Sequence, residues 1–315
     1  MKKKKIVKTT LVSLAAIGMT WILNKAIFFY STVKQVLNSE NGHFYKWRFG
    51  NIYYMKKGEG TPLLLVHDLN CASSNYEWKY VVDDLSKRHT VYAIDLLGCG
   101  HSDKPKMTYT NYLYVQLLND FVKDVIKGKT DIMTSNKASS LAIMACHMDT
   151  SLYHKLLFIN PASVRASYKT PDTGSKALKF AMSMPVIGTL AYNIIFSSLA
   201  VSRKFEYEYI YDKDHIRKSD IDAYHESAHL GGASSRFLYA SIRSYFTEAG
   251  IERALRACDH SIFIISGAQS FHAEEIAEAY VTINPAIEVS VIEHTRALPH
   301  VEKPDKVVEN CRIYL

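Results

Sequence analysis

The sequence has few cysteines, no repeated or low-complexity segment, and little net charge beyond its first residues. Its five cysteines are scattered, odd in number and without the spacing of metal ligands, so we expect buried thiols, no disulfide framework and no metal. The formal charge falls from +7 to +2 when the five lysines before the first apolar run, Lys2 to Lys5 and Lys8, are set aside. A nucleic-acid partner, which needs a basic patch on the folded body, is therefore not expected, and neither is a cofactor.

The first apolar run, from Thr9 to Tyr30, is long enough to be a membrane anchor. It contains 22 residues, with Asn24 and Lys25 as its main polar interruptions, and about 20 apolar residues span a bilayer. No small-residue cleavage site follows it, which favours an uncleaved anchor over residues 1–30, although a signal peptide and an interfacial helix are alternatives. The lysines that precede it predict a single-pass protein with an extracytoplasmic body.

The rest of the chain is predicted to be a polar linker over residues 31–42 and an α/β domain over residues 43–315. Continuous apolar runs such as "PLLLV", "VYAIDL", "LLFIN" and "IFIIS" alternate with helical patterns. This alternation is typical of a parallel sheet covered by helices on both faces. Residues 163 to about 257 lack strand-like runs and are predicted to form a helical insertion over one end of the sheet.

Five motifs occur in the order expected of one large superfamily: "LLLVHDL", "YAIDLLGCGHSDKP", "LLFINPAS", "IFIISGAQ" and "ALPHVEKPDKV". Together they make residues 43–315 resemble the α/β-hydrolases, in particular the lid-bearing branch of esterases, lyases and C–C hydrolases. The resemblance implies a mainly parallel eight-stranded sheet with a helical cap inserted after the sixth strand. It also identifies Asp95, Gly98, Gly100 and Ser102 as a structural motif.

The resemblance also places the catalytic triad, and all three of its positions are substituted. The family's nucleophilic serine lies on a strand-to-helix turn, G-x-S-x-G, which aligns with "SNKASS" and puts Lys137 at the apex. The acid that follows the seventh strand aligns with Ser270 in "SGAQSF", and the histidine aligns with Ala297 in "RALPHVEKP". None of these side chains performs the role of the residue it replaces.

The oxyanion hole is altered as well. The family's "H-G" motif aligns with His67 and Asp68, so the two N–H donors are predicted to be those of Leu69 and Ala138. An ionised Asp68 at this point opposes the binding of an oxyanion. The alternative is that Asp68 is a turn residue that faces solvent.

These substitutions favour a pseudoenzyme that binds a small apolar or anionic ligand, or a partner, at a membrane. One alternative is a hydrolase of small or lipid-like esters that uses Ser135 or Ser139. Another is a Schiff-base centre at Lys137, which needs a desolvated, neutral lysine amine. His294 and His300, on either side of the expected histidine position, are predicted to be structural or exposed. The sequence carries no signal for an oligomeric state.

Overall fold

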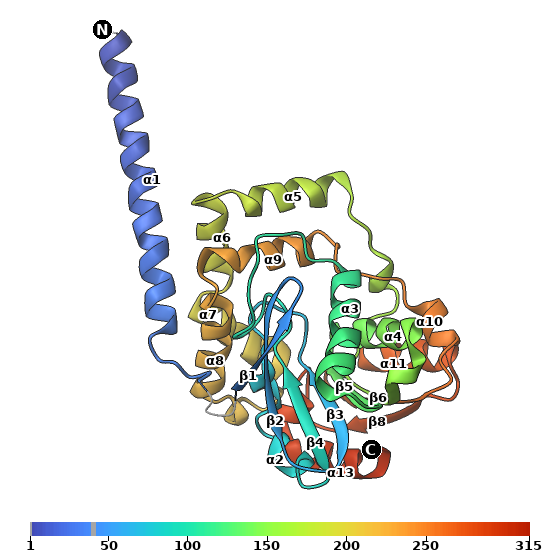
Figure 1. Cartoon of the computed structure of the whole chain (residues 1–315). Coiled ribbons are helices and arrows are strands. Elements are labelled where there is room, and N and C mark those ends of the chain that lie inside the picture. The colour runs from blue at the N-terminus through green and yellow to red at the C-terminus, as the bar shows by residue number, and fades with distance from the viewer. Residues whose placement is uncertain (1, 39–41) are drawn as a thin grey trace.

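The computed structural model describes residues 2–38 and 42–315, and their side chains except those of residues 2–9 and 12. Residues 39–41 of the predicted linker lie outside the described residues. Eight strands of the described chain form one sheet in the order β1-β2-β4-β3-β5-β6-β7-β8. The first two pairings in this order are antiparallel and the others are parallel, which confirms the predicted mainly parallel sheet (Figure 1). The strand bounds are β1 Gly42–Trp47, β2 Gly50–Lys57, β3 Thr61–Val66, β4 His89–Ile94, β5 Thr130–Ser135, β6 Tyr153–Ile159, β7 Ser261–Gly267 and β8 Glu288–Ile292.

Helices cover both faces of the sheet. The face that contains Leu64 and Ile132 packs against α3, α4, α10 and α11, and the opposite face, with Leu65 and Met133, packs against α2 and α13. Neighbouring residues of a strand point to opposite faces, so a strand buried on both sides needs a continuous apolar run. The helices named here are α2 Val82–Leu85, α3 Asn111–Phe121, α4 Ala138–Met148, α10 Glu252–Arg256, α11 Ala273–Ile283 and α13 Pro304–Tyr314, with the single turn α12 at Pro299–Glu302.

Between β6 and β7 the chain forms a cap of helices above the sheet (Figure 1). The cap contains α5 Thr173–Ser183, α6 Ile187–Ile195, α7 Ser198–Lys204, α8 Lys218–His229 and α9 Arg236–Arg243. This is the region predicted from the sequence as a helical insertion.

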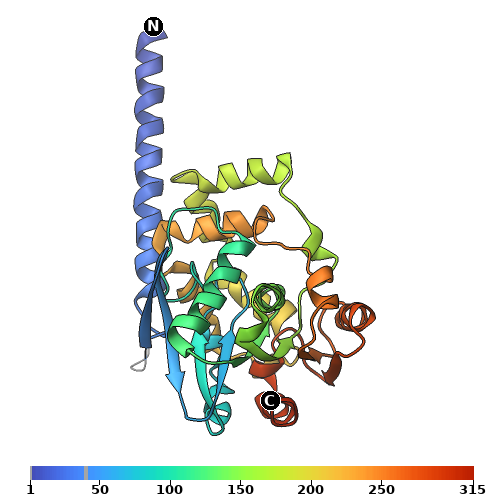
Figure 2. The ribbon, with the colours of Figure 1, turned by 45° about the vertical axis from the view of Figure 1, so that its right-hand side comes forward.

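The N-terminal helix α1, Lys2–Thr32, projects from the body (Figures 1 and 2). Its segment Ser13–Thr32 is long and apolar enough to cross a membrane. The helix packs on α6 and α8 of the cap, and its buried described residues are Asn24 and Phe28, so α1 is a candidate anchor.

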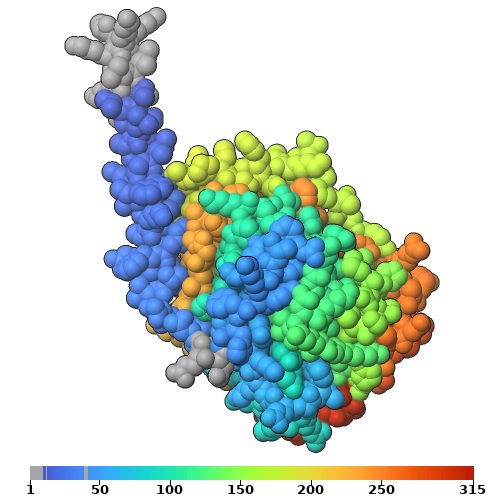
Figure 3. Space-filling model, in the orientation of Figure 1, coloured from blue at the N-terminus to red at the C-terminus, as the bar shows by residue number. Residues whose placement is uncertain are grey.

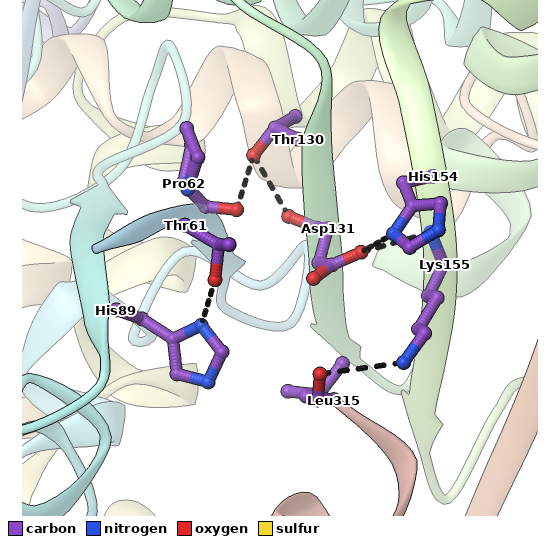
Figure 4. Close-up of polar contacts among 8 residues, drawn as sticks. All are labelled: Thr61, Pro62, His89, Thr130, Asp131, His154, Lys155 and Leu315. Atoms are coloured by element: carbon purple, nitrogen blue, oxygen red, sulfur yellow. Dashed lines mark hydrogen bonds and ion pairs between the residues drawn. The ribbon is translucent and has the colours of Figure 1, made fainter.

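The edge of the sheet at which the parallel strands begin is joined by polar contacts (Figure 4). The buried Asp131 of β5 accepts hydrogen bonds from the His154 ring and from the Lys155 N–H, each at 3.0 Å. Thr61 contacts His89 at 2.8 Å. These contacts satisfy strand ends far from the cap and are structural.

All five cysteines are free, and Cys71, Cys99, Cys146 and Cys311 are buried. No group of three or more possible metal ligands occurs in the described part of the chain.

Candidate functional site

The turn between β5 and α4 has its strained residue at Asn136. Strand β5 ends at Ser135 and helix α4 begins at Ala138. Between them Asn136 has a φ of 45°, in the left-handed region that side chains other than glycine rarely adopt. A sharp, strained strand-to-helix turn is what the α/β-hydrolase nucleophile requires. The apex is therefore Asn136, one residue before the Lys137 assigned from the sequence, and it bears an amide instead of a hydroxyl.

The three positions assigned to the triad converge on one cavity. A cavity of about 310 Å³ is lined by Asn136 and Lys137 from the turn, Ser270 from the segment after β7, and Ala297 from the segment after β8. The cap contributes Tyr209 to its wall. The turn after β5 thus meets the segments after β7 and β8, which follow it much later in the chain, at one cavity.

Two amides hold the loops around this cavity. The side chain of Asn160, just after β6, donates to the carbonyl oxygens of Arg296 at 2.9 Å and Ala297 at 3.0 Å. Its side-chain oxygen accepts the Gly267 N–H at 3.0 Å. Gln269 accepts the Thr295 N–H through its side chain at 3.0 Å. These side-chain amides therefore hold the segments after β6, β7 and β8 against one another.

The side chain of Asp68 accepts a hydrogen bond from the backbone N–H group that would otherwise stabilise an oxyanion. In this fold the first donor is the N–H of the residue after the nucleophile, which is Lys137 when Asn136 is the apex, and not Ala138 as the sequence alignment placed it. The Lys137 N–H donates to Asp68 Oδ1 at 3.2 Å. Asp68 is buried, which contradicts the solvent-facing alternative.

The environment of Asp68 favours its neutral form. Burial raises its pKa, the nearby Glu77 carboxylate raises it further, and Lys137 lowers it, so that the pKa is about 7 instead of the ordinary 3.8. The neighbouring His67 lies within 2.7 Å of the Asp68 carbonyl oxygen through Nδ1 and accepts the Leu96 N–H through Nε2 at 3.1 Å. His67 therefore fixes the turn that presents Asp68, and Leu69 is buried behind it.

Lys137 forms an ion pair with Glu248, a residue that no sequence pattern indicated. Its Nζ lies 2.6 Å from Glu248 Oε1, with side chains that are 35% and 12% exposed. Glu248 follows α9 and is 111 residues away in the chain. This ion pair stabilises the ammonium form, whereas a Schiff-base centre needs the neutral amine.

The serines and histidines of the alternative sites lie outside the cavity or deep in the protein. Ser135 and Ser139 are both buried, and Ser139 bonds to Thr134 at 3.0 Å. His300 is fully buried against Glu77, with Nε2 3.3 Å from Oε1, whereas His294 is exposed with its ring against Tyr211.

Glu77 is a buried acid that sequence reasoning missed. Burial raises its pKa, but His300 and His67 lower it more, and the net pKa lies below the ordinary value. No local pattern marks this group, because its partners come from distant segments.

The motif after β4 is a structural hub. Asp95 is buried and accepts the N–H groups of Asn75 at 2.6 Å and His101 at 2.7 Å. Ser102 donates to the Asp95 carbonyl oxygen at 2.6 Å. Gly98 and Gly100 have positive φ, and a Cβ on Gly100 would lie 2.1 Å from Asp95 Oδ2. The motif positions the strand end and carries no chemistry of its own.

Comparison with known proteins agrees with the fold. Residues 61–134, from β3 to β5, match the family described as having the alpha/beta hydrolase fold. The chain as a whole has the α/β-hydrolase fold.

Two curated relatives are similar over part of their length. A 2-hydroxy-6-oxo-6-(2'-aminophenyl)hexa-2,4-dienoic acid hydrolase from Metapseudomonas resinovorans is 27% identical over 113 residues, which are 35% of this chain and 39% of the relative. A soluble epoxide hydrolase from Corynebacterium sp. (strain C12) is 26% identical over 122 residues, or 38% and 42% of the two chains. The chain thus spans about two fifths of the length of the relatives it matches.

Solved structures share the fold over most of the chain. The CarC serine hydrolase of carbazole degradation superposes with a TM-score of 0.72 at 16% identity, covering 87% of this chain and 97% of that one. A membrane phospholipase A superposes with a TM-score of 0.69 at 16% identity, covering 100% and 98% of the two chains.

Proposed function

We propose that this chain is a membrane-anchored α/β-hydrolase-family protein that lacks serine-dependent catalysis and binds an apolar ligand or a partner. The observation that carries the proposal is the Asp68 carboxyl group on the Lys137 N–H, 3.2 Å away. An oxyanion needs that donor free, and loss of one such donor costs about 10²–10³ in rate in the measured case. The Asp68 carboxyl group occupies the donor, and its ionised form also repels the developing charge.

The cavity supports binding of a small molecule. Its volume of about 310 Å³ is at the lower end of the range of about 300–1,000 Å³ typical of ligand sites. Of the two ligand classes expected from the sequence, the apolar one is favoured. Lys137 is already paired with Glu248, and Glu208 adds a carboxylate to the cavity wall, so an anion gains little there.

Anchoring by α1 is part of the proposal. It is supported by the apolar segment Ser13–Thr32, by the lysines that precede it and by the likeness over the whole chain to a membrane phospholipase A. The positive-inside rule then places the body outside the cytoplasm. Protease treatment of intact cells tests the topology: the body should be digested, and a protected body would reverse the orientation.

The alternative function is hydrolysis of small or lipid-like esters, and the names of the relatives favour hydrolytic activity in general. It requires a nucleophile at Ser135 or Ser139, and both are buried. The test uses the full chain in detergent, a fluorophosphonate probe and a short-chain p-nitrophenyl ester, with an active serine esterase in parallel. We expect neither labelling nor turnover above the buffer rate. Labelling that Ser135→Ala or Ser139→Ala abolishes would establish the hydrolase instead.

Binding without turnover is tested separately. Fatty acids, their methyl esters and monoacylglycerols of increasing chain length should raise the unfolding temperature of the protein, because a ligand that binds only the folded state stabilises it. The methyl esters should act at least as strongly as the acids if the site prefers neutral apolar molecules. No stabilisation by any of them would leave partner binding as the function.

A further inference from the structure

The side of helix α5 that faces away from the body is apolar. Residues Ala177, Phe180 and Ala181 are exposed, with Phe180 at 71%, while Ser175 and Met182 are buried on the body side. Globular proteins usually bury their largest apolar side chains and expose serine. Helix α5 departs from this at Phe180 and Ser175, and the exposed apolar surface continues at the start of α6, where Ile187 is 67% exposed.

This face lies where α1 meets the cap. The buried Asn24 of α1 donates from Nδ2 to the Val186 carbonyl oxygen at 3.1 Å and accepts from Asn193 Nδ2 at 2.9 Å. Val186 lies in the bend of 100° that joins α5 to α6. The exposed residues Phe180 and Ile187 flank that bend on either side, so they sit near the level at which α1 leaves the body.

The length of α1 before Asn24 locates this level relative to a bilayer. Leu14, Ile17, Met19 and Ile22 are more than half exposed, and Asn24 is the first buried residue among the described side chains of α1. At about 1.5 Å per residue, the rise to Asn24 from Thr9, which follows the last leading lysine, is about 22 Å, against a hydrocarbon thickness of about 30 Å. A bilayer that begins at Thr9 therefore has its other boundary about 8 Å beyond Asn24, so the α5–α6 bend lies within the depth of about 5–10 Å that the apolar face of an interfacial helix reaches.

The direction and charge of α5 fit such a surface. In Figures 1 and 2, α5 runs across the direction of α1, so it lies roughly in the plane of a membrane that α1 crosses; in Figure 3 it forms the ridge of the cap beside α1. Its two lysines, Lys176 and Lys179, suit anionic headgroups, as in helices that lie at membrane interfaces.

From this geometry we infer that the outer face of α5 and the α5–α6 bend lie in the headgroup layer of the membrane, so that the cap contacts lipid directly. The inference rests on the proposed anchoring by α1. It makes α1 and α5 two parts of one membrane-binding surface.

The test measures lipid contact at chosen positions of the full chain. Cys258, the one cysteine that is not buried, is replaced by serine, and a bimane fluorophore is attached to one new cysteine at a time. The positions are Ile17→Cys on α1, Phe180→Cys and Ile187→Cys on the cap, and Ile313→Cys on α13 as the control. Each protein is reconstituted into vesicles of phosphatidylcholine and phosphatidylglycerol with a nitroxide on the acyl chain.

We expect loss of fluorescence at positions 17, 180 and 187 and none at 313. A nitroxide near the headgroup should quench positions 180 and 187 more than a nitroxide at the chain end, and position 17 should show the opposite order. Quenching at 17 together with values at 180 and 187 equal to that at 313 overturns the cap contact and leaves the anchor intact. Values at 17 equal to that at 313 overturn the anchoring and the inference that rests on it. Thermal unfolding of each labelled protein establishes that it is folded.

Discussion

Replacement of Asp68 by asparagine is expected to stabilise the protein, and the gain should grow with pH. The folded-state pKa of Asp68 is about 7, against 3.8 for an unperturbed carboxyl. Between these values the unfolded chain has lost the proton that the folded chain still holds, so stability falls as pH rises from about 4 to about 7 and is constant above it. One pH unit corresponds to about 1.36 kcal/mol, so the full loss is about 4 kcal/mol at pH 8.

Asparagine keeps the shape and an acceptor for the Lys137 N–H but cannot ionise. The assay is urea unfolding in detergent at pH 8 and pH 5, with Asp83→Asn, a carboxylate that is 74% exposed, as the matched control. We expect a gain of about 4 kcal/mol at pH 8 and less than half of that at pH 5 for Asp68→Asn, and none for the control. An equal gain at both pH values, or no gain at pH 8, would refute the assignment of a buried, destabilising carboxylate next to the turn.

Substitutions at three further positions test the framework by the same unfolding assay. Asn136→Ala should cost about 1 kcal/mol because of the left-handed backbone, and Asn136→Gly should cost nothing; equal losses would place the strain elsewhere. Gly100→Ala should cost about 3 kcal/mol because its Cβ would overlap the Asp95 carboxylate; a fully stable variant would contradict the packing of this turn. Asp131→Ala should lower the free energy of unfolding by about 1–3 kcal/mol, because it removes the acceptor for His154. It should not change the stabilisation of the protein by ligand. A change in that stabilisation would show that this edge of the sheet has a functional role.

The sheet could be predicted because its signal is local. Strands β3 and β7 contain short apolar runs, and a strand covered on both faces needs such a run whatever its neighbours are. The helical content of the cap could be predicted from the sequence, but the arrangement of its helices could not. The bend at Val186 and the contacts of α6 with α1 depend on residues far apart in the chain. The apolar run of α1 was visible in the sequence, whereas the exposed apolar face of α5 is defined only by what the body buries on its other side.

The sequence predicted where the candidate site lies, but not the register of its turn or all of its contacts. The motifs placed the right loops together, yet the turn was assigned one residue too late because small residues lie on both sides of the apex. The signal for Asn136 was present, because asparagine is one of the few residues that tolerate a left-handed backbone. The pairing of Lys137 with Glu248 and the burial of Asp68 arise from tertiary contacts that no local pattern specifies.

If only side chains separate this site from an active one, restoring them should restore chemistry. The expected combination is Asn136→Ser, Ser270→Asp and Ala297→His, with Asp68→Gly to free the Lys137 N–H. Serine at 136 then lies on the strained turn that exposes a nucleophile, and the loops for acid and base already border the same cavity.

The control carries the same changes at 68, 270 and 297 but has Lys137→Ser in place of Asn136→Ser, and so tests the alternative register. We expect fluorophosphonate labelling and ester turnover only with serine at position 136, because the members of a triad act as a unit and a displaced nucleophile loses nearly all of their effect. Labelling of the Lys137→Ser protein instead would show that the apex of the turn is residue 137 and not residue 136. A folded Asn136→Ser protein that neither labels nor turns over the ester would show that the cavity itself, and not its missing side chains, excludes hydrolysis.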